Sequence, residues 1–252
     1  MIKFNYKDVA KKQGWNFEAI SPIVEDNSNY FYYKEVVNAI TPNTVMLDIG
    51  CGSGEKSIRY FSNAKKVVML DNEPEMIKRV EANLNRILTS KEIEKFEAKL
   101  ADGCGKLDFP DEYFNLVVSR HCGGNMSEIF RVLKKGGIFI SEDVDHTDCL
   151  ELKTLFKRGQ GFENIQNGKS EKKDIIDECV KLNFSDISLK NFEYIEYYKD
   201  KDQLTYLITK TPILTYFDEN LDAKLLNEYI SKNLSPKGIK LVRRLYAFHL
   251  VK

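Results

Sequence analysis

Three glycines at alternate positions, Gly50, Gly52 and Gly54, stand between an apolar segment and a segment that can form a helix. The apolar run at residues 45–49 predicts a buried strand, and residues 55–61 can begin a helix. Glycine lets the chain turn tightly where a ligand approaches bare backbone. Backbone N–H groups and the helix dipole at such a turn can hold an anion. Strand, glycine turn and helix together are typical of the first half of a nucleotide-binding α/β unit.

Acidic side chains mark the ends of three predicted strands. Asp48 lies at the first of them, Asp71 follows residues 66–70, and Asp102 follows residues 96–101. In a parallel sheet these carboxylates would gather at the carboxyl edge, where α/β proteins bind ligands. They suit a ribose diol, an exocyclic amine and a cation better than a pyrophosphate. S-adenosylmethionine offers all three groups, and its single carboxylate can use the helix N-terminus.

Five segments in order resemble the motifs of class I S-adenosylmethionine-dependent methyltransferases. They are residues 48–54, Asp71, Ala101-Asp102-Gly103, residues 108–119 and residues 128–140. Five ordered motifs are a far more specific signal than one glycine pattern. The resemblance covers roughly residues 44–142. It implies an α/β, Rossmann-like fold with a seven-stranded mixed sheet of order 3-2-1-4-5-7-6, its last strand antiparallel, with helices on both faces and helical cap insertions.

The resemblance also implies roles for individual residues. Asp71 would bind the ribose hydroxyls, and Asp102 would meet the adenine amine. Met76 falls on the sheet-facing side of the next predicted helix, from which it can also touch adenine. The expected contacts of the cofactor S-adenosylmethionine, and of its product S-adenosylhomocysteine, are Asp48, Gly50, Cys51, Gly52, Gly54, Asp71, Asn72, Met76, Ala101, Asp102, Gly103 and Ser119.

An NAD site is the alternative interpretation of the glycine turn. The dinucleotide fingerprint is Gly-x-Gly-x-x-Gly, with an acid after the next strand. Here the third glycine, Gly54, comes one residue early, and Asp48 precedes the first glycine. The pattern therefore favours S-adenosylmethionine over a dinucleotide.

The composition of the 252 residues, 42% apolar and 30% charged, is that of a globular protein with a full core. Lysine plus arginine equals aspartate plus glutamate, at 38 each, which gives no support for a broad nucleic-acid-binding face. No run approaches the ~18 apolar residues of a membrane helix, and the first residues lack the pattern of a secretory signal. We therefore expect a cytoplasmic protein that acts on a small molecule.

The cysteines and histidines argue against disulfides and metals. Five cysteines, at positions 51, 104, 122, 149 and 179, include no Cys-x-x-Cys pair, which favours free thiols in a reducing compartment. The first three each follow a predicted strand end and are expected to cluster near the ligand. His121, His146 and His249 lack metal-ligand spacing, so no metal site is expected.

We expect one methyltransferase domain over residues 1–252, with three additions to its core. Residues 1–40 form an aromatic arm, with helices at 6–14 and 30–40, that either packs on the core or covers the ligands. Residues 143–174 follow a strand end and are interpreted as a mobile cover at the active-site edge. Residues 200–238 form a helical insertion between strands six and seven, at 186–198 and 241–251. Asn72 and Glu75 match a capping box for the helix after the second strand.

His121 is the candidate general base, because it ends the fourth strand and an imidazole titrates near neutral pH. A structural role is its alternative. Methylation of a protonated O or N acceptor needs such a base, whereas a carboxylate acceptor does not. The further candidates for substrate contact are His146, Arg158, Gln160 and Tyr33. Two other functions remain open: methylation of RNA or protein, and non-catalytic binding of S-adenosylmethionine.

Overall fold

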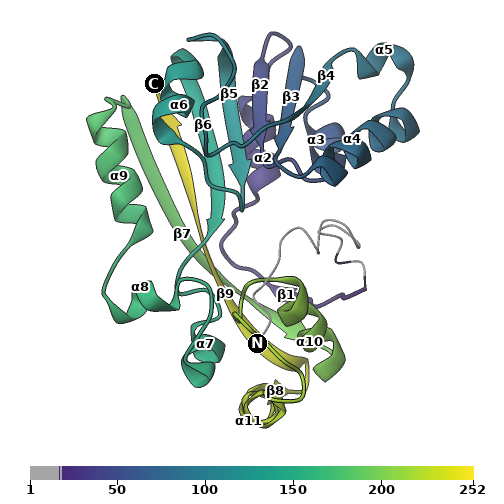
Figure 1. The fold of residues 1–252 in the computed structure, drawn as a ribbon, viewed down its shortest axis with the longest axis vertical. Helices are drawn as coiled ribbons and strands as arrows, with labels where there is room; N and C mark the ends of the chain where they lie inside the picture. The colour runs from purple at the N-terminus through teal and green to yellow at the C-terminus, as the bar shows by residue number, and fades with distance from the viewer. Residues whose placement is uncertain (1–16, 18) are drawn as a thin grey trace. The chain divides into compact units, whose positions relative to one another are not determined.

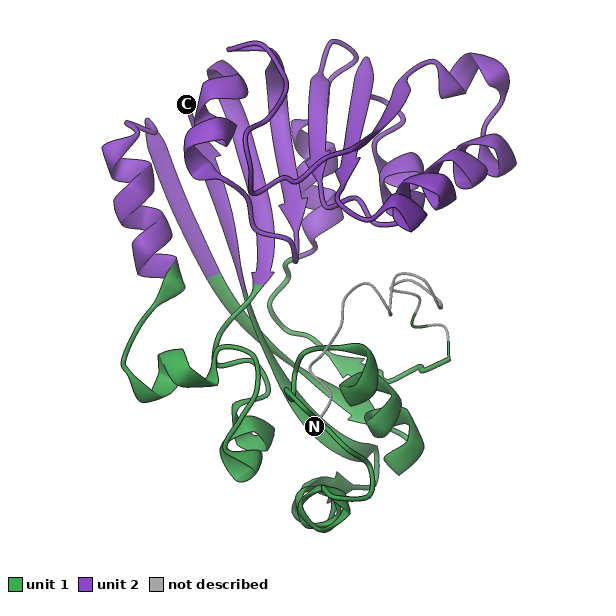
Figure 2. Cartoon of the chain, in the orientation of Figure 1, with its two compact units in different colours: residues 1–30, 144–171, 191–245 green, residues 31–143, 172–190, 246–252 purple. Residues whose placement is uncertain are grey.

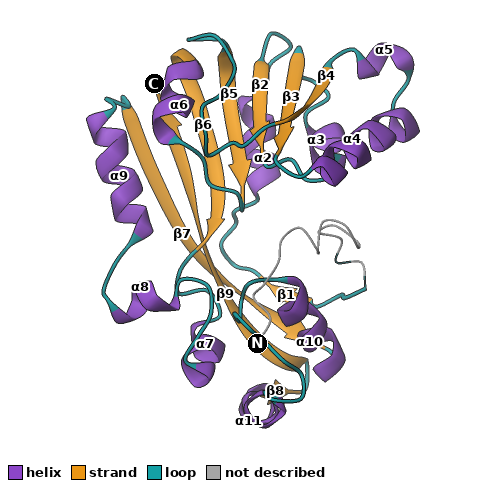
Figure 3. Ribbon diagram, in the orientation of Figure 1, coloured by secondary structure: helices purple, strands orange, loops and turns teal. Residues whose placement is uncertain are grey.

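The structure is a computed structural model that describes Phe17 and residues 19–252. Five parallel strands form the part of the sheet that follows the predicted motifs (Figure 1, Figure 3). Neighbouring strands align as in Leu47↔Val68 and Leu47↔Val117. The buried apolar runs of residues 45–49, 66–71 and 114–119 are typical of parallel strands covered on both faces. The five strands are β2 (Val45–Ile49), β3 (Lys66–Asp71), β4 (Phe96–Leu100), β5 (Phe114–Arg120) and β6 (Leu133–Val144).

The last long strand, β9 (Gly238–Val251), runs antiparallel to β6. Gly136 N–H donates to Lys252 O near one end of this pair, and Asp145 N–H donates to Arg244 O near the other. On its other side β9 neighbours β7 (Asp186–Tyr198), and the complete strand order is β1-β7-β9-β6-β5-β2-β3-β4. The seven predicted strands therefore follow one another in the predicted order, which confirms the predicted fold class.

The predicted number of strands was too low, because two short strands were missed. β1 (Ile23–Glu25) pairs antiparallel with β7, with Ile23 opposite Tyr197. β8 (Leu234–Ser235) pairs antiparallel with β9. Segments of three and two residues are too short to show the alternation that identifies a strand in a sequence.

The chain divides into two compact units, which Figure 2 distinguishes by colour. Unit 1 comprises Met1–Tyr30, Val144–Glu171 and Asn191–Leu245. Unit 2 comprises Phe31–Asp143, Lys172–Lys190 and Tyr246–Lys252. Each unit has its own apolar core, one around Leu152, Leu204 and Leu241 and the other around Leu47, Val68 and Val117. The long strands β7 and β9 contribute residues to both.

Unit 2 contains helices that connect its parallel strands, among them α4 between β3 and β4. In α4 the apolar residues Met76, Val80 and Leu84 recur at helical spacing and are buried, as expected for the sheet-facing side. The predicted cap at Asn72 is wrong: Glu73 is the N-cap, its side chain makes no capping bond, and Pro74 fills the first helical position. The helices are α2 (Tyr32–Ala39), α3 (Glu55–Tyr60), α4 (Pro74–Ile87), α5 (Ser90–Ile93), α6 (Met126–Val132) and α9 (Glu171–Lys181).

Unit 1 contains the helices of the two segments predicted to be a cover and an insertion. α7 (Leu150–Phe156) and α8 (Phe162–Gln166) lie within residues 143–174, and α10 (Lys201–Lys210) and α11 (Ala223–Asn233) lie within residues 200–238. α7 contributes buried apolar side chains to the core of unit 1. The helix predicted at residues 6–14 lies outside the described residues. No helix among the residues that the structure describes is long and apolar enough to cross a membrane.

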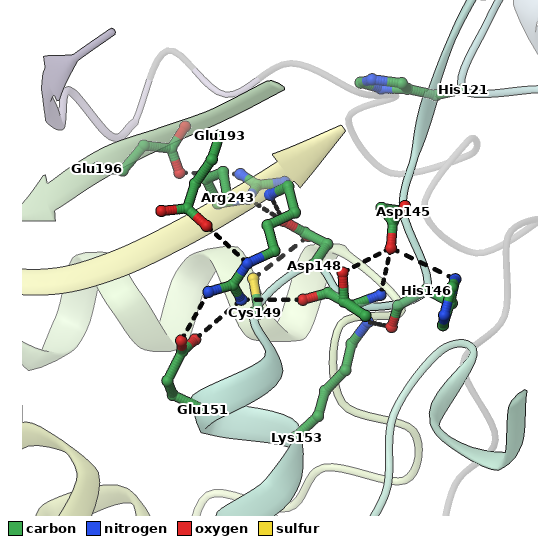
Figure 4. Close-up of polar contacts among 12 residues, drawn as sticks. His121, Asp145, His146, Asp148, Cys149, Glu151, Lys153, Glu193, Glu196 and Arg243 are labelled. Atoms are coloured by element: carbon green, nitrogen blue, oxygen red, sulfur yellow. Dashed lines mark hydrogen bonds and ion pairs between the residues drawn. The ribbon is translucent and has the colours of Figure 1, made fainter. Parts of the chain in front are cut away.

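A buried ionic cluster lies next to α7 in unit 1 (Figure 4). Arg243 Nε donates to Asp148 Oδ1 at 3.0 Å, and its NH1 group donates to Glu196 Oε2 at 2.9 Å. Asp148 also accepts the backbone N–H of Arg244 at 2.8 Å and the thiol of Cys149 at 3.3 Å. Asp148 is fully buried. A buried charge of this kind depends on its partners, because it has lost its hydration.

Candidate cofactor and active site

The glycine turn after β2 uses most of its own N–H groups inside the protein. The bonds run from Gly50 and Cys51 to Leu70 O, from Gly52 to Asp71 Oδ2, and from Gly54 to Cys51 O, at 2.8–3.1 Å. A phosphate site needs such N–H groups to point at the ligand. The turn is therefore poorly equipped for a pyrophosphate. The following helix, α3, has only six residues, so its dipole adds less than the sequence suggested.

Two of the glycines are required by the shape of the turn. Gly50 has a φ of +73°, and a Cβ there would lie 2.4 Å from the Sγ of Cys122. Gly52 has a φ of +56°, and nothing lies within 4 Å of the position that its Cβ would take. Left-handed backbone of this kind favours glycine. The space beside Gly52 leaves the turn open to a ligand on that side.

Asp71, at the end of β3, is held in place by the backbone on both sides. Its Oδ2 accepts the N–H of Gly52 and its Oδ1 accepts the N–H of Glu73, each at 2.9 Å. Burial raises the pKa of Asp71, and these two bonds act in the opposite direction. A carboxylate can accept more than two hydrogen bonds. Asp71 is therefore a fixed acceptor, with capacity left for hydroxyl donors.

The third predicted motif forms a tight loop after β4. Ala101 N–H donates to Asp71 O at 3.0 Å, which links the ends of β3 and β4. Asp102 is exposed, and its Oδ1 accepts the N–H of Cys104 at 2.9 Å. A Cβ at Gly103 would lie 2.2 Å from Cγ2 of Ile49, so only glycine lets this loop pack against β2.

Three other predicted cofactor residues differ in how open they are. Ser119 is fully buried, and its hydroxyl donates to Gly123 O at 2.7 Å. Met76 is 2% exposed and packs in the core. Asn72, in contrast, is exposed next to Asp71. Ser119 and Met76 are therefore enclosed by the protein, whereas Asn72 is open to solvent.

Asp48 is buried within β2, where its carboxylate accepts a short hydrogen bond from the hydroxyl of Ser57. Burial raises the pKa of Asp48 to about 6, and the bond from Ser57 opposes this rise. The neighbouring charge of Asp71 raises it further. The hydrogen bond from Ser57 therefore favours the ionised form of Asp48, whereas desolvation disfavours it.

Replacing Asp48 with asparagine should stabilise the protein at pH 8 but not at pH 4. The raised pKa means that the native state holds a proton that the unfolded state releases, so stability falls as pH rises from about 4 to about 6. The rise in pKa on folding corresponds to a loss of roughly 1–3 kcal/mol in the free energy of unfolding at high pH. Asp48→Asn should recover this loss above about pH 6. Urea unfolding at both pH values measures the difference. Asp102→Asn, at an exposed site, should change stability by less than about 0.5 kcal/mol at either pH.

The three cysteines expected near the ligand do share one electrostatic environment. Burial raises the pKa of Cys122 to about 12, and the carboxylates of Asp71 and Asp143 raise it further. Burial also raises the pKa of Cys51, where Asp48 and Asp71 add to the effect. These thiols are free and neutral. The carboxylates around them make this part of the edge attractive to a cation.

His121 follows β5 in a strained conformation, with a φ of +56°. Its backbone N–H donates to Glu142 O at 2.8 Å, and its Nε2 lies 3.5 Å from Glu142 Oε1. Arg120 Nε donates to the same Oε1 at 2.7 Å. Burial acts to raise the pKa of Glu142, but His121 and Arg120 together hold it below its ordinary value. The imidazole is thus held by an ionised, 5% exposed carboxylate.

Arg120 and Glu142 were not among the predicted site residues. They lie opposite each other where β5 and β6 pair. The sequence did hold a clue to this pair. Arg120 and Glu142 carry opposite charges and stand at the ends of two strands that were predicted to be neighbours in the sheet. Only the register of those strands shows that the two side chains meet.

Tyr33, predicted as a substrate contact, lies in unit 2 at the start of α2. Its ring stacks on that of Tyr60, with 4.5 Å between the ring centroids and 14° between the ring planes. The guanidinium carbon of Arg120 lies 5.6 Å from the centroid of Tyr33. Helix α2 therefore places Tyr33 beside the Arg120–Glu142 pair.

The other predicted substrate contacts belong to unit 1 and have local partners there. His146 Nδ1 lies 3.3 Å from Asp145 Oδ1 (Figure 4). Arg158 forms a short ion pair with the buried Asp222. Gln160 donates its backbone N–H to Pro212 O at 3.2 Å. The substrate roles of these three residues stay predictions.

Comparison with known proteins agrees with the fold and the motifs. A family model described as "Methyltransferase domain" matches residues 40–211. A protein of Methanobrevibacter smithii, named as a probable cobalt-precorrin-6B C(15)-methyltransferase (decarboxylating), is 24% identical over 52% of the chain and 73% of its own length. A sterol 24-C-methyltransferase of Yarrowia lipolytica is 30% identical over 48% of the chain, and the chain spans only about a third of that relative, 32%.

Solved structures agree as well. A candidate methyltransferase of Bacillus halodurans matches with a TM-score of 0.61 and 17% identity, over 87% of this chain and 96% of its own. Phosphoethanolamine N-methyltransferase 2 of Haemonchus contortus, solved with S-adenosyl-L-methionine, matches with a TM-score of 0.55 and 16% identity, over 98% of this chain and 60% of its own. At such identities the likeness shows the fold, whereas the family model spans more than half of the chain. The chain therefore belongs to the class I S-adenosylmethionine-dependent methyltransferases.

Proposed function

We propose that the chain transfers the methyl group of S-adenosylmethionine to a hydroxyl or amine of a small molecule, with His121 as general base. The observation that carries this proposal is the strained His121, which directly follows β5 and is held by the buried Glu142 of β6. A non-glycine residue with positive φ stores about 1–3 kcal/mol of strain and is often found at functional sites.

The residues at the carboxyl edge fit S-adenosylmethionine better than a dinucleotide. Most N–H groups of the glycine turn already donate within the protein, which disfavours a pyrophosphate. The carboxylates that act on Cys51 and Cys122 favour a cationic ligand. Asp71, fixed by two backbone bonds, suits a ribose diol, and the exposed Asp102 suits an exocyclic amine.

The protein's part in the reaction is to orient the acceptor, exclude water and move one proton. When bound, S-adenosylmethionine supplies an activated methyl group, so the protein need not activate the donor. His121 would accept the proton of the acceptor hydroxyl or ammonium as the acceptor reacts. Glu142 would hold the imidazole in place and stabilise its protonated form, and Arg120 keeps Glu142 ionised.

A small acceptor is supported by the balanced charge of the chain and by its relatives. The relatives' names refer to small molecules, among them a cobalt-precorrin, a sterol and demethylmenaquinone. Balanced charge also argues against RNA as the acceptor, because nucleic-acid binding relies on clustered basic residues.

Calorimetric titration with S-adenosylmethionine, S-adenosylhomocysteine and NAD tests the cofactor. We expect binding of the first two and none of NAD; binding of NAD alone would contradict the proposal. Transfer of a radiolabelled methyl group to a panel of phenols, carboxylates and amines then tests the reaction. Cofactor binding without transfer to any acceptor would favour a non-catalytic binding protein, and salt-dependent transfer to RNA would favour a nucleic-acid substrate.

Replacing Asp71 with alanine should weaken binding of S-adenosylmethionine by roughly 1–3 kcal/mol, or about 5- to 150-fold in Kd. The change removes the acceptor proposed for the ribose hydroxyls and also leaves the N–H groups of Gly52 and Glu73 without their side-chain acceptor. Asp71→Asn keeps an amide oxygen that can accept a backbone N–H of the turn but removes the carboxylate. It therefore separates the loss of ribose binding from disruption of the turn. Calorimetry of both variants and of Asp108→Ala, an exposed control, makes the comparison. Unchanged affinity in both Asp71 variants would remove this residue from the ribose site.

A further inference from the structure

Two tyrosines and two arginines of unit 2 form a stack at its surface, which we name the arginine–tyrosine stack: Arg59, Tyr60, Tyr33 and Arg120. The stacked rings of Tyr33 and Tyr60 each carry a guanidinium, with Arg120 at 5.6 Å from one ring centroid and Arg59 at 5.4 Å from the other. Phe31 lies edge-on to both rings and is 52% exposed. Exposed aromatic rings beside cations are suited to binding a flat anion.

Arg120 is the arginine that a buried partner holds in place. Its Nε donates to Glu142 Oε1, and the side chain of Glu142 is 7% exposed while that of Arg120 is 41% exposed. This bond uses one of the five N–H donors of the guanidinium. The planar fork of an arginine fixed in this way recognises a carboxylate better than a mobile lysine would.

A buried hydroxyl in the same neighbourhood lacks a partner. Tyr32 is 3% exposed, and its hydroxyl makes no hydrogen bond to any residue that the structure describes. Arg120, Glu142 and Asp48 are among the charged groups that act on it. A buried polar group left unpaired costs about 1–3 kcal/mol, so one in a native protein points to a water or ligand that satisfies it.

The charges at the carboxyl edge differ from one side to the other. Near Cys51 and Cys122 the charges of aspartate carboxylates act, whereas near Tyr32 and Tyr33 the cation Arg120 acts together with the carboxylates of Asp48 and Glu142. The first side suits the sulfonium and ammonium of the cofactor. On the second side the partly exposed guanidinium of Arg120 offers N–H donors beyond its bond to Glu142, and Arg120 adjoins His121 in the chain.

We propose that the arginine–tyrosine stack binds the methyl acceptor and that the acceptor is a small aromatic acid. Its carboxylate pairs with Arg120, and its ring lies against the aromatic side chains of Phe31 and Tyr33. An acceptor anchored on Arg120 is held next to the base at the following position. This inference rests on the proposed function and adds the class of the substrate.

The test measures binding of two probes of the same shape, para-hydroxybenzoate and the neutral para-hydroxybenzamide, by calorimetry of the full chain saturated with S-adenosylhomocysteine. We expect the acid to bind at least about tenfold more tightly than the amide, because a charge-assisted pair with arginine forms only with the acid. Arg120→Met should abolish this preference, and Arg120→Lys should keep part of it. Arg86→Met, an exposed control on α4, should leave it unchanged.

A second variant, Tyr33→Leu, tests the aromatic part of the proposed acceptor site. Tyr33→Leu removes aromatic surface without changing the charge, so it should weaken both probes by a similar factor. Binding of S-adenosylhomocysteine reports folding of the site in every variant, and its absence in the native chain would overturn the proposed function itself. If S-adenosylhomocysteine binds but the two probes do not differ, the aromatic-acid inference is wrong. Tight, salt-dependent binding of a single-stranded RNA that Tyr33→Leu abolishes would assign the stack to nucleic acid instead.

Discussion

His121→Asn should lower turnover by roughly 10²- to 10⁴-fold and leave the affinity for S-adenosylmethionine within about twofold. Asparagine tolerates the left-handed backbone at this position, so the turn should survive while the base is lost. The limb of the pH–rate profile that reports deprotonation of the general base should disappear. Steady-state kinetics with an acceptor found by the methyl-transfer screen, together with calorimetry, measure these effects.

His146→Asn is the matched comparison, because His146 is the second histidine proposed for the substrate side. Its turnover should stay within a few-fold of the native value. If His146→Asn loses turnover and His121→Asn does not, the base has been assigned to the wrong histidine. An equal loss of turnover and cofactor affinity in His121→Asn would make His121 a binding residue.

Asp148→Ala should destabilise the protein by about 3–5 kcal/mol, the usual effect of breaking a buried ion pair by removing one partner. The change takes away one of the two carboxylates of Arg243, whose side chain is 12% exposed. It also leaves the N–H of Arg244 and the thiol of Cys149 without their acceptor (Figure 4). Urea unfolding followed by two spectroscopic probes measures the loss, with two probes because the chain has two compact units.

Glu151→Ala provides the control for this network. Glu151 pairs with Arg244 at 2.8 Å, but its side chain is 46% exposed, so its loss should cost less than about 1 kcal/mol. The double variant Asp148→Ala/Arg243→Met should be more stable than Asp148→Ala, because it also removes a buried cation that has lost one of its two carboxylates. Equal effects of Asp148→Ala and Glu151→Ala would mean that burial of Asp148 adds nothing to the stability of the pair.

Long elements with a clear period were predictable from the sequence. β7 begins and ends at the predicted residues, because thirteen residues rich in tyrosine, phenylalanine and isoleucine follow one another there. α4 follows its apolar spacing, although its first turn depends on Pro74 and not on the predicted Asn72 cap. β1 and β8 are too short for any periodicity, and they form because β7 and β9 offer backbone partners.

In the candidate site, too, the residues that belong to a local sequence pattern were predictable, whereas their hydrogen-bond partners from other strands were not. The glycines and the strand-end aspartates are local features, and each lies at the predicted strand end. The hydrogen bonds of the glycine turn depend on Leu70 and Asp71, which lie on the next strand. Glu142 and Asp222 lie 21 and 64 residues from the side chains that they hold, His121 and Arg158. Partners at such distances are fixed by strand register and packing, which a single sequence does not display.

The strained backbone at His121 bears on which residue related sequences keep at this position. At a φ of +56°, glycine or asparagine would have a lower conformational energy than histidine. The histidine at this position therefore reduces the stability of the folded state. Selection for turnover would keep it there, and selection for folding alone would remove it. Among chains that share this turn, a histidine at this position would mark those that still transfer methyl groups. Glycine or asparagine would mark those that have become binding proteins.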